Sequence, residues 1–215
     1  MSLRVAVLVS GEGSNLQAIL DHANGRDGVE VVAVGSNRAG ARGLERARAA
    51  GVETGVFEAG AYASRPERDE ALADWLDGHG VELLVLAGFM ELLAAPFIRR
   101  FAGRIINVHP SLLPAFPGVR AIEQAIEYGV KQMGVSVHFV DEGVDSGAII
   151  LQEAFAIDPP YSRDIAAIEE RVHEIEHKLL PRAVRLVAAG AVRVDPESPR
   201  HVIVEQEEVA PHGHD

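Results

Sequence analysis

The chain has 215 residues, with 20 Lys and Arg against 32 Asp and Glu, so its formal net charge is −12. This length suits one well-buried domain, and the acidity argues against nucleic acid or an anionic membrane as a partner, because both attract clustered cations. The absence of cysteine excludes disulfides, thiolate metal sites and cysteine nucleophiles. No apolar run approaches the roughly 18 residues of a transmembrane helix, and the N-terminal residues indicate a strand and not a signal peptide, so we expect a cytoplasmic protein.

The first half alternates short apolar runs with amphipathic stretches. Strands are predicted at Arg4–Val9, Val29–Gly35, Glu53–Phe57, Leu83–Ala87 and Arg104–Val108. Helices are predicted between them, at Asn15–His22, Ala41–Ala50, Pro66–Gly78 and Ala94–Arg100. Strands that are apolar throughout and alternate with helices indicate a parallel sheet covered on both faces. The predicted fold class is therefore α/β, with an open, doubly wound, mostly parallel sheet.

The second half extends this sheet and leads into a long C-terminal helix. Gly134–Val140 and Ala148–Ala156 are predicted strands joined by a turn-rich segment, which gives an antiparallel extension. Beyond Asp158-Pro159-Pro160, apolar residues recur at helical spacing between Ile165 and Val184.

Two residues are expected to interrupt that helix. Pro181 should kink it or end a segment of it, and Gly190 should stop it. We expect one domain over residues 1–194 and an acidic tail with prolines and histidines over residues 195–215. The tail is expected to contain a short strand at His201–Val204 and to be weakly ordered from Glu205 onward.

A glycine-containing loop, Ser10-Gly11-Glu12-Gly13-Ser14-Asn15, follows the first predicted strand. Such a turn presents free backbone N–H groups and a helix N-terminus to an anion. The dinucleotide fingerprint requires a third glycine where this chain has Leu16, and a triphosphate loop requires Gly-Lys-Ser/Thr, so a monophosphate fits better. The alternative is an ordinary strand-to-helix turn capped by Ser14.

Two chemically suitable side chains lie at the end of the fifth predicted strand. Asn107 and His109 are two residues apart and therefore point to the same face. An amide that binds an oxyanion beside an imidazole that exchanges a proton suits carbonyl chemistry, although an isolated histidine is more often structural. Asp145 lies in a glycine-rich turn from which its carboxylate can favour the imidazolium. No G-x-S-x-G elbow is present, so serine acyl transfer is not expected.

These segments together resemble a known family. Ser10–Gln17, Leu86–Met90, Asn107–Pro114, Val137–Val140 and Asp145–Gly147 occur in the order found in phosphoribosylglycinamide formyltransferases, folate-dependent enzymes of purine biosynthesis. The resemblance runs from about Arg4 to Gly190. It implies transfer of a formyl group from 10-formyltetrahydrofolate to the amine of the glycinamide ribonucleotide by direct attack.

The resemblance also implies residue roles. The catalytic positions match Asn107, His109 and Asp145. The family's positions that bind the ribonucleotide phosphate match Gly13, Ser14 and Asn15, and the position that contacts its ribose matches Glu176. The folate positions match Arg65, Met90, Glu91, Leu92, Leu93 and Asn107. No metal is implied, the partners are small molecules, and the protein is expected to be a monomer or homodimer.

The sequence departs from the family at one position of the folate segment, and it leaves three alternative functions open. Glu91 stands where the family often has Arg; if the contact is not made by backbone, Glu91 would repel the folate glutamate tail. Because both substrates are anions, Arg65, Arg120 and Arg171 are candidates for a locally positive field. The main alternative is a 10-formyltetrahydrofolate hydrolase, which usually carries a further domain. Formylation of initiator tRNA would call for a basic domain, and a non-catalytic binding module would not need His109.

Overall fold

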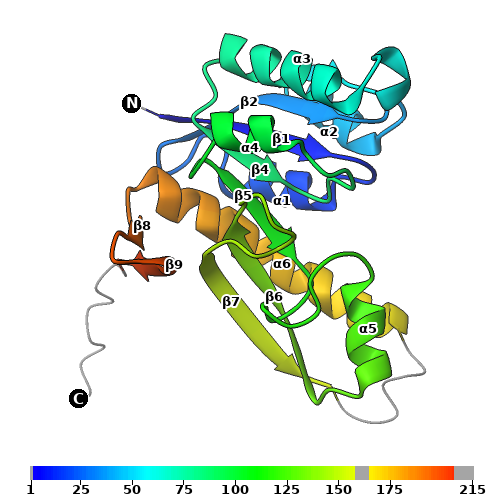
Figure 1. The fold of residues 1–215 in the computed structure, drawn as a ribbon, viewed down its shortest axis with the longest axis vertical. Helices are drawn as coiled ribbons and strands as arrows, with labels where there is room; N and C mark the ends of the chain where they lie inside the picture. The colour runs from blue at the N-terminus through cyan, green and yellow to red at the C-terminus, as the bar shows by residue number, and fades with distance from the viewer. Residues whose placement is uncertain (1, 158–164, 206–215) are drawn as a thin grey trace.

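The computed structural model describes residues 2–157 and 165–205. Seven strands form one mixed sheet in the order β3-β2-β1-β4-β5-β6-β7 (Figure 1). The strands are β1 (Leu3–Val9), β2 (Val29–Ser36), β3 (Glu53–Val56), β4 (Leu83–Leu86), β5 (Ile105–His109), β6 (Gln132–Phe139) and β7 (Ile149–Ala156). β1 to β5 pair in parallel, whereas β6 pairs antiparallel with both β5 and β7. The predicted parallel sheet with an antiparallel extension is confirmed.

Helices cover both faces of the sheet, as the alternating sequence pattern predicts (Figure 1). The helices are α1 (Ser14–His22), α2 (Arg42–Ala49), α3 (Arg65–Gly78), α4 (Ala95–Arg100), α5 (Ala121–Tyr128) and α6 (Ile165–Ala188), with a 3-10 turn at Ala59–Ala61. None of the helices in the described residues is both long and apolar enough to cross a membrane.

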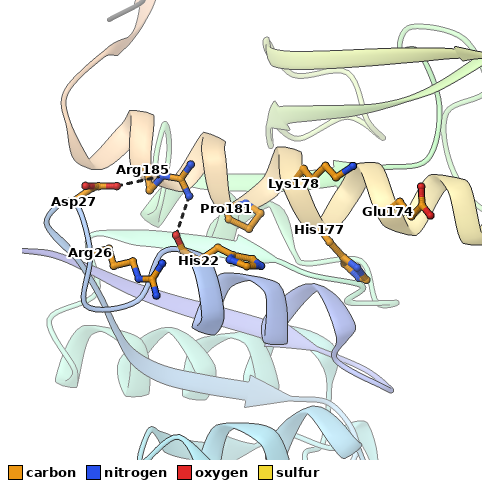
Figure 2. A pocket seen from close by; sticks show the side chains of 8 residues that line it. All are labelled: His22, Arg26, Asp27, Glu174, His177, Lys178, Pro181 and Arg185. Atoms are coloured by element: carbon orange, nitrogen blue, oxygen red, sulfur yellow. Dashed lines mark hydrogen bonds and ion pairs between the residues drawn. The ribbon is translucent and has the colours of Figure 1, made fainter.

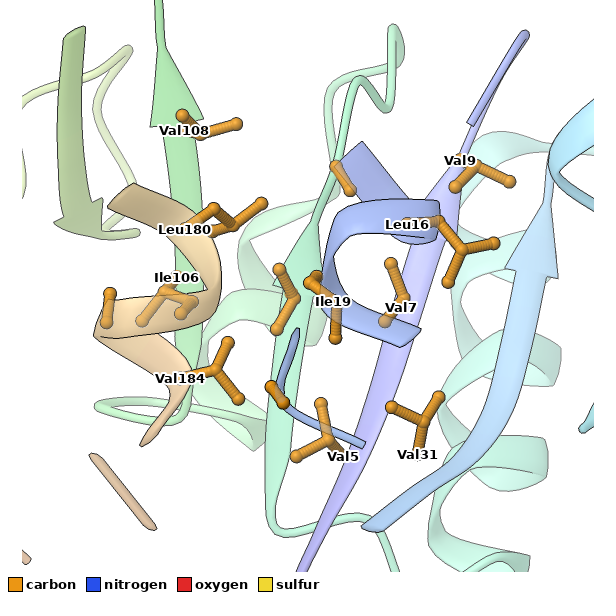
Figure 3. Close-up of a cluster of buried hydrophobic side chains, with 14 of the residues drawn as sticks. Val5, Val7, Val9, Leu16, Ile19, Val31, Ile106, Val108, Leu180 and Val184 are labelled. Atoms are coloured by element: carbon orange, nitrogen blue, oxygen red, sulfur yellow. The ribbon is translucent and has the colours of Figure 1, made fainter. Parts of the chain in front are cut away.

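The core consists of two apolar layers, one on each face of the sheet. Val5, Val7 and Val9 of β1 pack with Leu16 and Ile19 of α1 (Figure 3). Leu180 and Val184 of α6 belong to the same layer. Ala6 and Leu8, the alternate residues of β1, pack in the second layer with residues of α3 and α4. Burial of both faces explains why the parallel strands are apolar throughout.

In the second half, the structure adds one helix to the predicted elements, and of the two outcomes predicted at Pro181 it excludes an end of the helix. Helix α5 has no counterpart among the predicted elements. Helix α6 continues past Pro181, which does not end it, and Gly190 follows the helix with φ 69°. The buried Leu179, Leu180 and Val184 on either side of Pro181 explain this, because tertiary packing outweighs one lost backbone hydrogen bond.

The end of the described chain forms a small second sheet. β8 (Val192–Asp195) and β9 (Ser198–Val204) pair antiparallel, and the predicted domain boundary at residue 194 lies inside this hairpin. The predicted strand at His201–Val204 is therefore the second half of β9. Asp158-Pro159-Pro160, and the predicted weakly ordered tail beyond Glu205, lie outside the described residues.

Candidate active site

The candidate residues gather where the strand order of the sheet reverses. β1 and β4 are neighbours, although β2 and β3 lie on one side of the pair and β5 on the other. In open α/β sheets the loops at the carboxyl ends of such neighbouring strands diverge and leave a crevice for ligands. The loop after β1 begins at Ser10, the segment after β4 begins at Ala87, and Ser10 N donates to Gly88 O across the two (3.2 Å).

The loop after β1 ends in a helix N-terminus that no side chain caps. Gly13 is the N-cap residue of α1 in the left-handed conformation, with φ 70° and ψ 32°. The alternative of a turn capped by Ser14 therefore does not describe this turn. The amide groups of the first helical turn remain available for an anion, as the monophosphate prediction requires.

We expect Gly13→Ala to destabilise the fold and to weaken ribonucleotide binding. A Cβ at Gly13 would lie 2.6 Å from Gly43 Cα, and the positive φ of this residue costs an L-amino acid about 1–2 kcal/mol before that clash is counted. Gly11→Ala is the matched control for stability, because a Cβ there meets nothing within 4 Å. Urea unfolding measures both variants, and equal stabilities would contradict the prediction.

A cavity of about 360 Å³ opens beside this loop. Its lining includes all four predicted ribonucleotide residues, Gly13, Ser14, Asn15 and Glu176, together with Arg38. Arg38 is not among the predicted cations, whereas two of the cations proposed for a positive field, Arg120 and Arg171, pair with acids three residues further along the chain. The sequence spacing contains no signal for Arg38, because β2 brings it to the loop only in the fold.

Glu176 and Asn15 form a buried polar pair in this cavity. Asn15 Nδ2 donates to Glu176 Oε2 (2.9 Å), and both residues are more than nine-tenths buried. Burial raises the pKa of Glu176 above its ordinary value, while the hydrogen bond from Asn15 and the nearby His173 lower it. Asn15 Oδ1 is buried and has no hydrogen-bond partner among the described residues, so the pair retains an acceptor for a ligand.

The three predicted catalytic residues meet at the end of β5. Asp145 Oδ2 lies 3.4 Å from His109 Nδ1, and Asp145 Oδ1 accepts from Asn107 Nδ2 at 3.4 Å. His109 Nε2 donates to Phe116 O (2.8 Å), so both ring nitrogens of His109 face acceptor oxygens. Phe116 and Asp145 both adopt positive φ, at 52° and 48°. Both residues therefore adopt a strained backbone conformation, and this conformation directs the Phe116 carbonyl and the Asp145 carboxylate toward His109.

His138 completes this cluster, although sequence reasoning gives it no role. It lies opposite Asn107 in the β5–β6 pairing and is 1% exposed. Its Nε2 lies 3.2 Å from Asn107 Nδ2 and 3.6 Å from Asp145 Oδ1, while its Nδ1 donates to Phe139 O (2.7 Å). The alternation of residues along β6 predicts which face of the sheet His138 lies on. It does not predict that β5, with Asn107, is the neighbouring strand.

Asp145 is held in its ionised form. Its burial would raise its pKa, but the His138 ring nearby, the hydrogen bond from the Gly118 N–H (2.7 Å to Oδ2) and the charge of His109 outweigh this. Together they lower the pKa of Asp145 from 3.8 to about 2. The carboxylate therefore stays charged throughout the neutral range and is available to stabilise a cation on His109.

We expect Asp145→Asn to cost stability in a pH-dependent way. A carboxyl group whose pKa is lower in the folded than in the unfolded state stabilises the fold above its unfolded pKa, here by about 2 kcal/mol. This contribution is lost as the pH falls from about 4 to about 2. Urea unfolding at neutral pH and near pH 3 should show the gap between wild type and variant narrowing. A gap of the same size at both pH values would contradict the prediction.

A second cavity of about 360 Å³ lies on the other side of the segment that follows β4. Its lining includes Arg65, Glu91, Leu92, Leu93, Asn107, His138 and Asp145. Five of the six predicted folate residues are therefore here. Met90 instead lines the first cavity, beside the loop after β1. The residues that follow β4 alternate in this respect, with Gly88 and Met90 facing one cavity and Phe89 and Glu91 facing the other.

A third depression, of about 850 Å³, lies between the end of α1 and helix α6 and contains none of the predicted site residues (Figure 2). Arg185 crosses it, donating to His22 O (2.8 Å) and pairing with Asp27 (3.3 Å). Burial, His173 and His22 lower the pKa of His177 in its wall. The contacts of Arg185 join the C-terminal end of α1 to α6, so they serve the fold.

Comparison with known proteins identifies the class. A family model described as formyl transferase matches residues 3–184. The chain is 41% identical over 192 residues to phosphoribosylglycinamide formyltransferase of Haemophilus influenzae, covering 89% of this chain and 90% of that protein. The crystal structure of glycinamide ribonucleotide transformylase 1 from Symbiobacterium toebii superposes with a TM-score of 0.88 at 46% identity, covering 95% of both chains.

A longer relative matches over the same region. The trifunctional purine biosynthetic protein adenosine-3 of Drosophila pseudoobscura pseudoobscura is 47% identical over 206 residues. The match covers 93% of this chain, which spans only 15% of that protein. The fold, the site and these matches define a formyl transferase, and the chain belongs to that family. Within it, the resemblance to phosphoribosylglycinamide formyltransferase predicted from the sequence motifs is confirmed.

Proposed function

We propose that this protein transfers the formyl group of 10-formyltetrahydrofolate to the amine of phosphoribosylglycinamide. The observation that carries the proposal is the pair of cavities on the two sides of one segment, with Asn107 and Asp145 lining the second. The first offers an uncapped helix N-terminus and Arg38, which suit a phosphate. The second, lined by Leu92, Leu93 and Arg65, suits a flat apolar ring that carries a carboxylate.

In this proposal the two substrates react directly. The ribonucleotide amine attacks the formyl carbon, and the carbonyl oxygen gains negative charge. Asn107 donates a hydrogen bond to that oxygen, and the His109 Nε2–H joins it by exchanging its contact with the Phe116 carbonyl for the oxyanion. A proton passes from the attacking amine to the departing folate nitrogen. Asp145 keeps its charge beside His109 and holds it in position. Binding both reactants side by side supplies a further part of the rate enhancement.

A steady-state assay with 10-formyltetrahydrofolate, run with and without the ribonucleotide, tests the proposal. Turnover that requires the ribonucleotide is the expected result. Formate release at the same rate without it would indicate the hydrolase instead. The names of the curated relatives support the transferase and not the hydrolase. Matched assays of Gly13→Ala would then show whether the loop after β1 binds the ribonucleotide, since the KM for that substrate alone should rise.

A further inference from the structure

The segment from Gly88 to Ala94 separates the two cavities and has no regular secondary structure. The Met90 and Leu92 side chains on it are 69% and 65% exposed, so little apolar packing fixes them. Its backbone contacts with β1 and the loop after it are few: Ser10 N donates to Gly88 O (3.2 Å), and Met90 N donates to Ser10 Oγ (2.8 Å). Other contacts must keep this wall in place.

Arg68 of α3 provides two of them. Its side chain is only 2% exposed and forms ion pairs with Asp69 and with Glu91. Arg68 donates to Asp69 Oδ1 through Nε (2.9 Å) and Nη2 (2.6 Å), and Asp69 Oδ2 accepts from Ala94 N (2.6 Å). The buried guanidinium is therefore tied to the segment at Glu91 directly and at Ala94 through Asp69.

The same network returns to the loop after β1. Asn37 Nδ2 donates to Glu91 Oε1 (2.8 Å), and Ser10 Oγ donates to Asn37 Oδ1 (2.7 Å). Ser10 Oγ in turn accepts from Met90 N, the residue beside Glu91. Ser10 and Asn37 are 3% and 7% exposed, so these contacts are shielded from bulk water. A charge-assisted hydrogen bond in such surroundings holds its partners in one geometry more firmly than a surface pair does.

We propose that Arg68 is a positioning residue for the formyl donor. Through Glu91 and Asp69 it fixes residues 91–94 as the wall of the donor cavity. The negative charge of Glu91 is directed at Arg68, so the substitution of Glu for the usual Arg does not leave an unpaired anion facing the folate. This inference rests on the function proposed above. A buried ion pair is costly to desolvate, and apolar residues often replace one without loss of stability, so such a pair is weak evidence for a stabilising role alone.

Glu91→Gln and Arg68→Met test the proposal through binding. A glutamine side chain in place of Glu91 would keep the shape and the hydrogen bond from Asn37 but lose the charge that holds Arg68. By calorimetry, we expect the Kd of the non-transferable donor analogue 5,8-dideazafolate to rise about tenfold in each variant, as expected for loss of one partner of a buried pair. The Kd of the ribonucleotide should change less than about twofold. Likewise, the KM of the formyl donor should rise, whereas the KM of the ribonucleotide should stay nearly unchanged.

Arg100→Met is the matched control. Arg100 also joins α4 to α3, through Asp74 and Asp77, but its ion pairs involve no residue of the segment 88–94. This control should leave both Kd values unchanged. Unchanged or tighter analogue binding in Glu91→Gln, or an equal loss for both ligands, would overturn the inference. If Arg68→Met does not fold, Glu91→Gln decides. A wild-type protein that binds the analogue without transferring formyl would refute the proposed function alone, because the Kd comparison needs no turnover.

Discussion

His109→Ala is expected to lower kcat by about 10²–10⁴-fold, the range typical of a lost acid–base group. The imidazole lies between the Asp145 carboxylate and the Phe116 carbonyl, and alanine can replace neither its hydrogen bonds nor its proton. KM values should change little, because the residues that line the two cavities are unaltered. Rapid-quench or steady-state measurement of formyl transfer at saturating substrates checks the prediction.

His22→Ala provides the control for this experiment. His22 is exposed and lines the depression between α1 and α6, away from either candidate cavity. Its replacement removes an imidazole without touching the proposed chemistry, so its kcat should equal that of the wild type. Turnover near wild type in His109→Ala would remove His109 from the mechanism.

Asn107→Ala is expected to lower kcat by about 10²–10³-fold, the cost of removing one oxyanion donor. Its amide nitrogen lies 3.4 Å from Asp145 and 3.2 Å from His138, and strand β5 holds it between β4 and β6. A rigid strand leaves the donor in place before the reaction begins, which is the condition under which it contributes most. The decrease should appear in kcat and kcat/KM alike.

Asn107→Asp is a sharper test, because it preserves the size and shape of the side chain. It replaces a donor with a carboxylate beside Asp145, so it adds negative charge where the transition state develops more of it. We expect a loss at least as large as that of Asn107→Ala. Activity near wild type in the aspartate variant would show that Asn107 does not bind the oxyanion.

The first half of the fold is predictable because β1, β4 and β5 are buried on both faces. Their apolar runs leave a strong pattern, and each predicted strand lies within two residues of the observed one. The sequence of helix α5 has no comparable apolar pattern. Only Ala121 and Ala125 of this helix are buried. The helix begins after Arg120, whose left-handed conformation is not predictable from an arginine.

The candidate site likewise contains residues that the sequence predicts and residues that only the fold reveals. Asn107, His109 and the loop after β1 are short, local patterns at strand ends, so spacing is enough to find them. Arg68 and His138 depend on partners from distant strands and helices, and neither has an unusual sequence context. Glu91 shows this limit: the sequence shows an acid where the family resemblance implies Arg, but only the fold shows the buried cation that pairs with it.

The hydrogen bond between Asn15 and Glu176 joins residues 161 positions apart in the chain. During synthesis the N-terminal strands and the loop after β1 emerge long before α6, but a domain generally folds as one unit. The loop after β1 is therefore synthesised early, but the cavity beside it is closed only when α6 docks, because α6 supplies His173 and Glu176 of its lining. A nascent chain that lacks α6 has no complete cavity, so the ribonucleotide should recognise only chains whose synthesis has passed that helix.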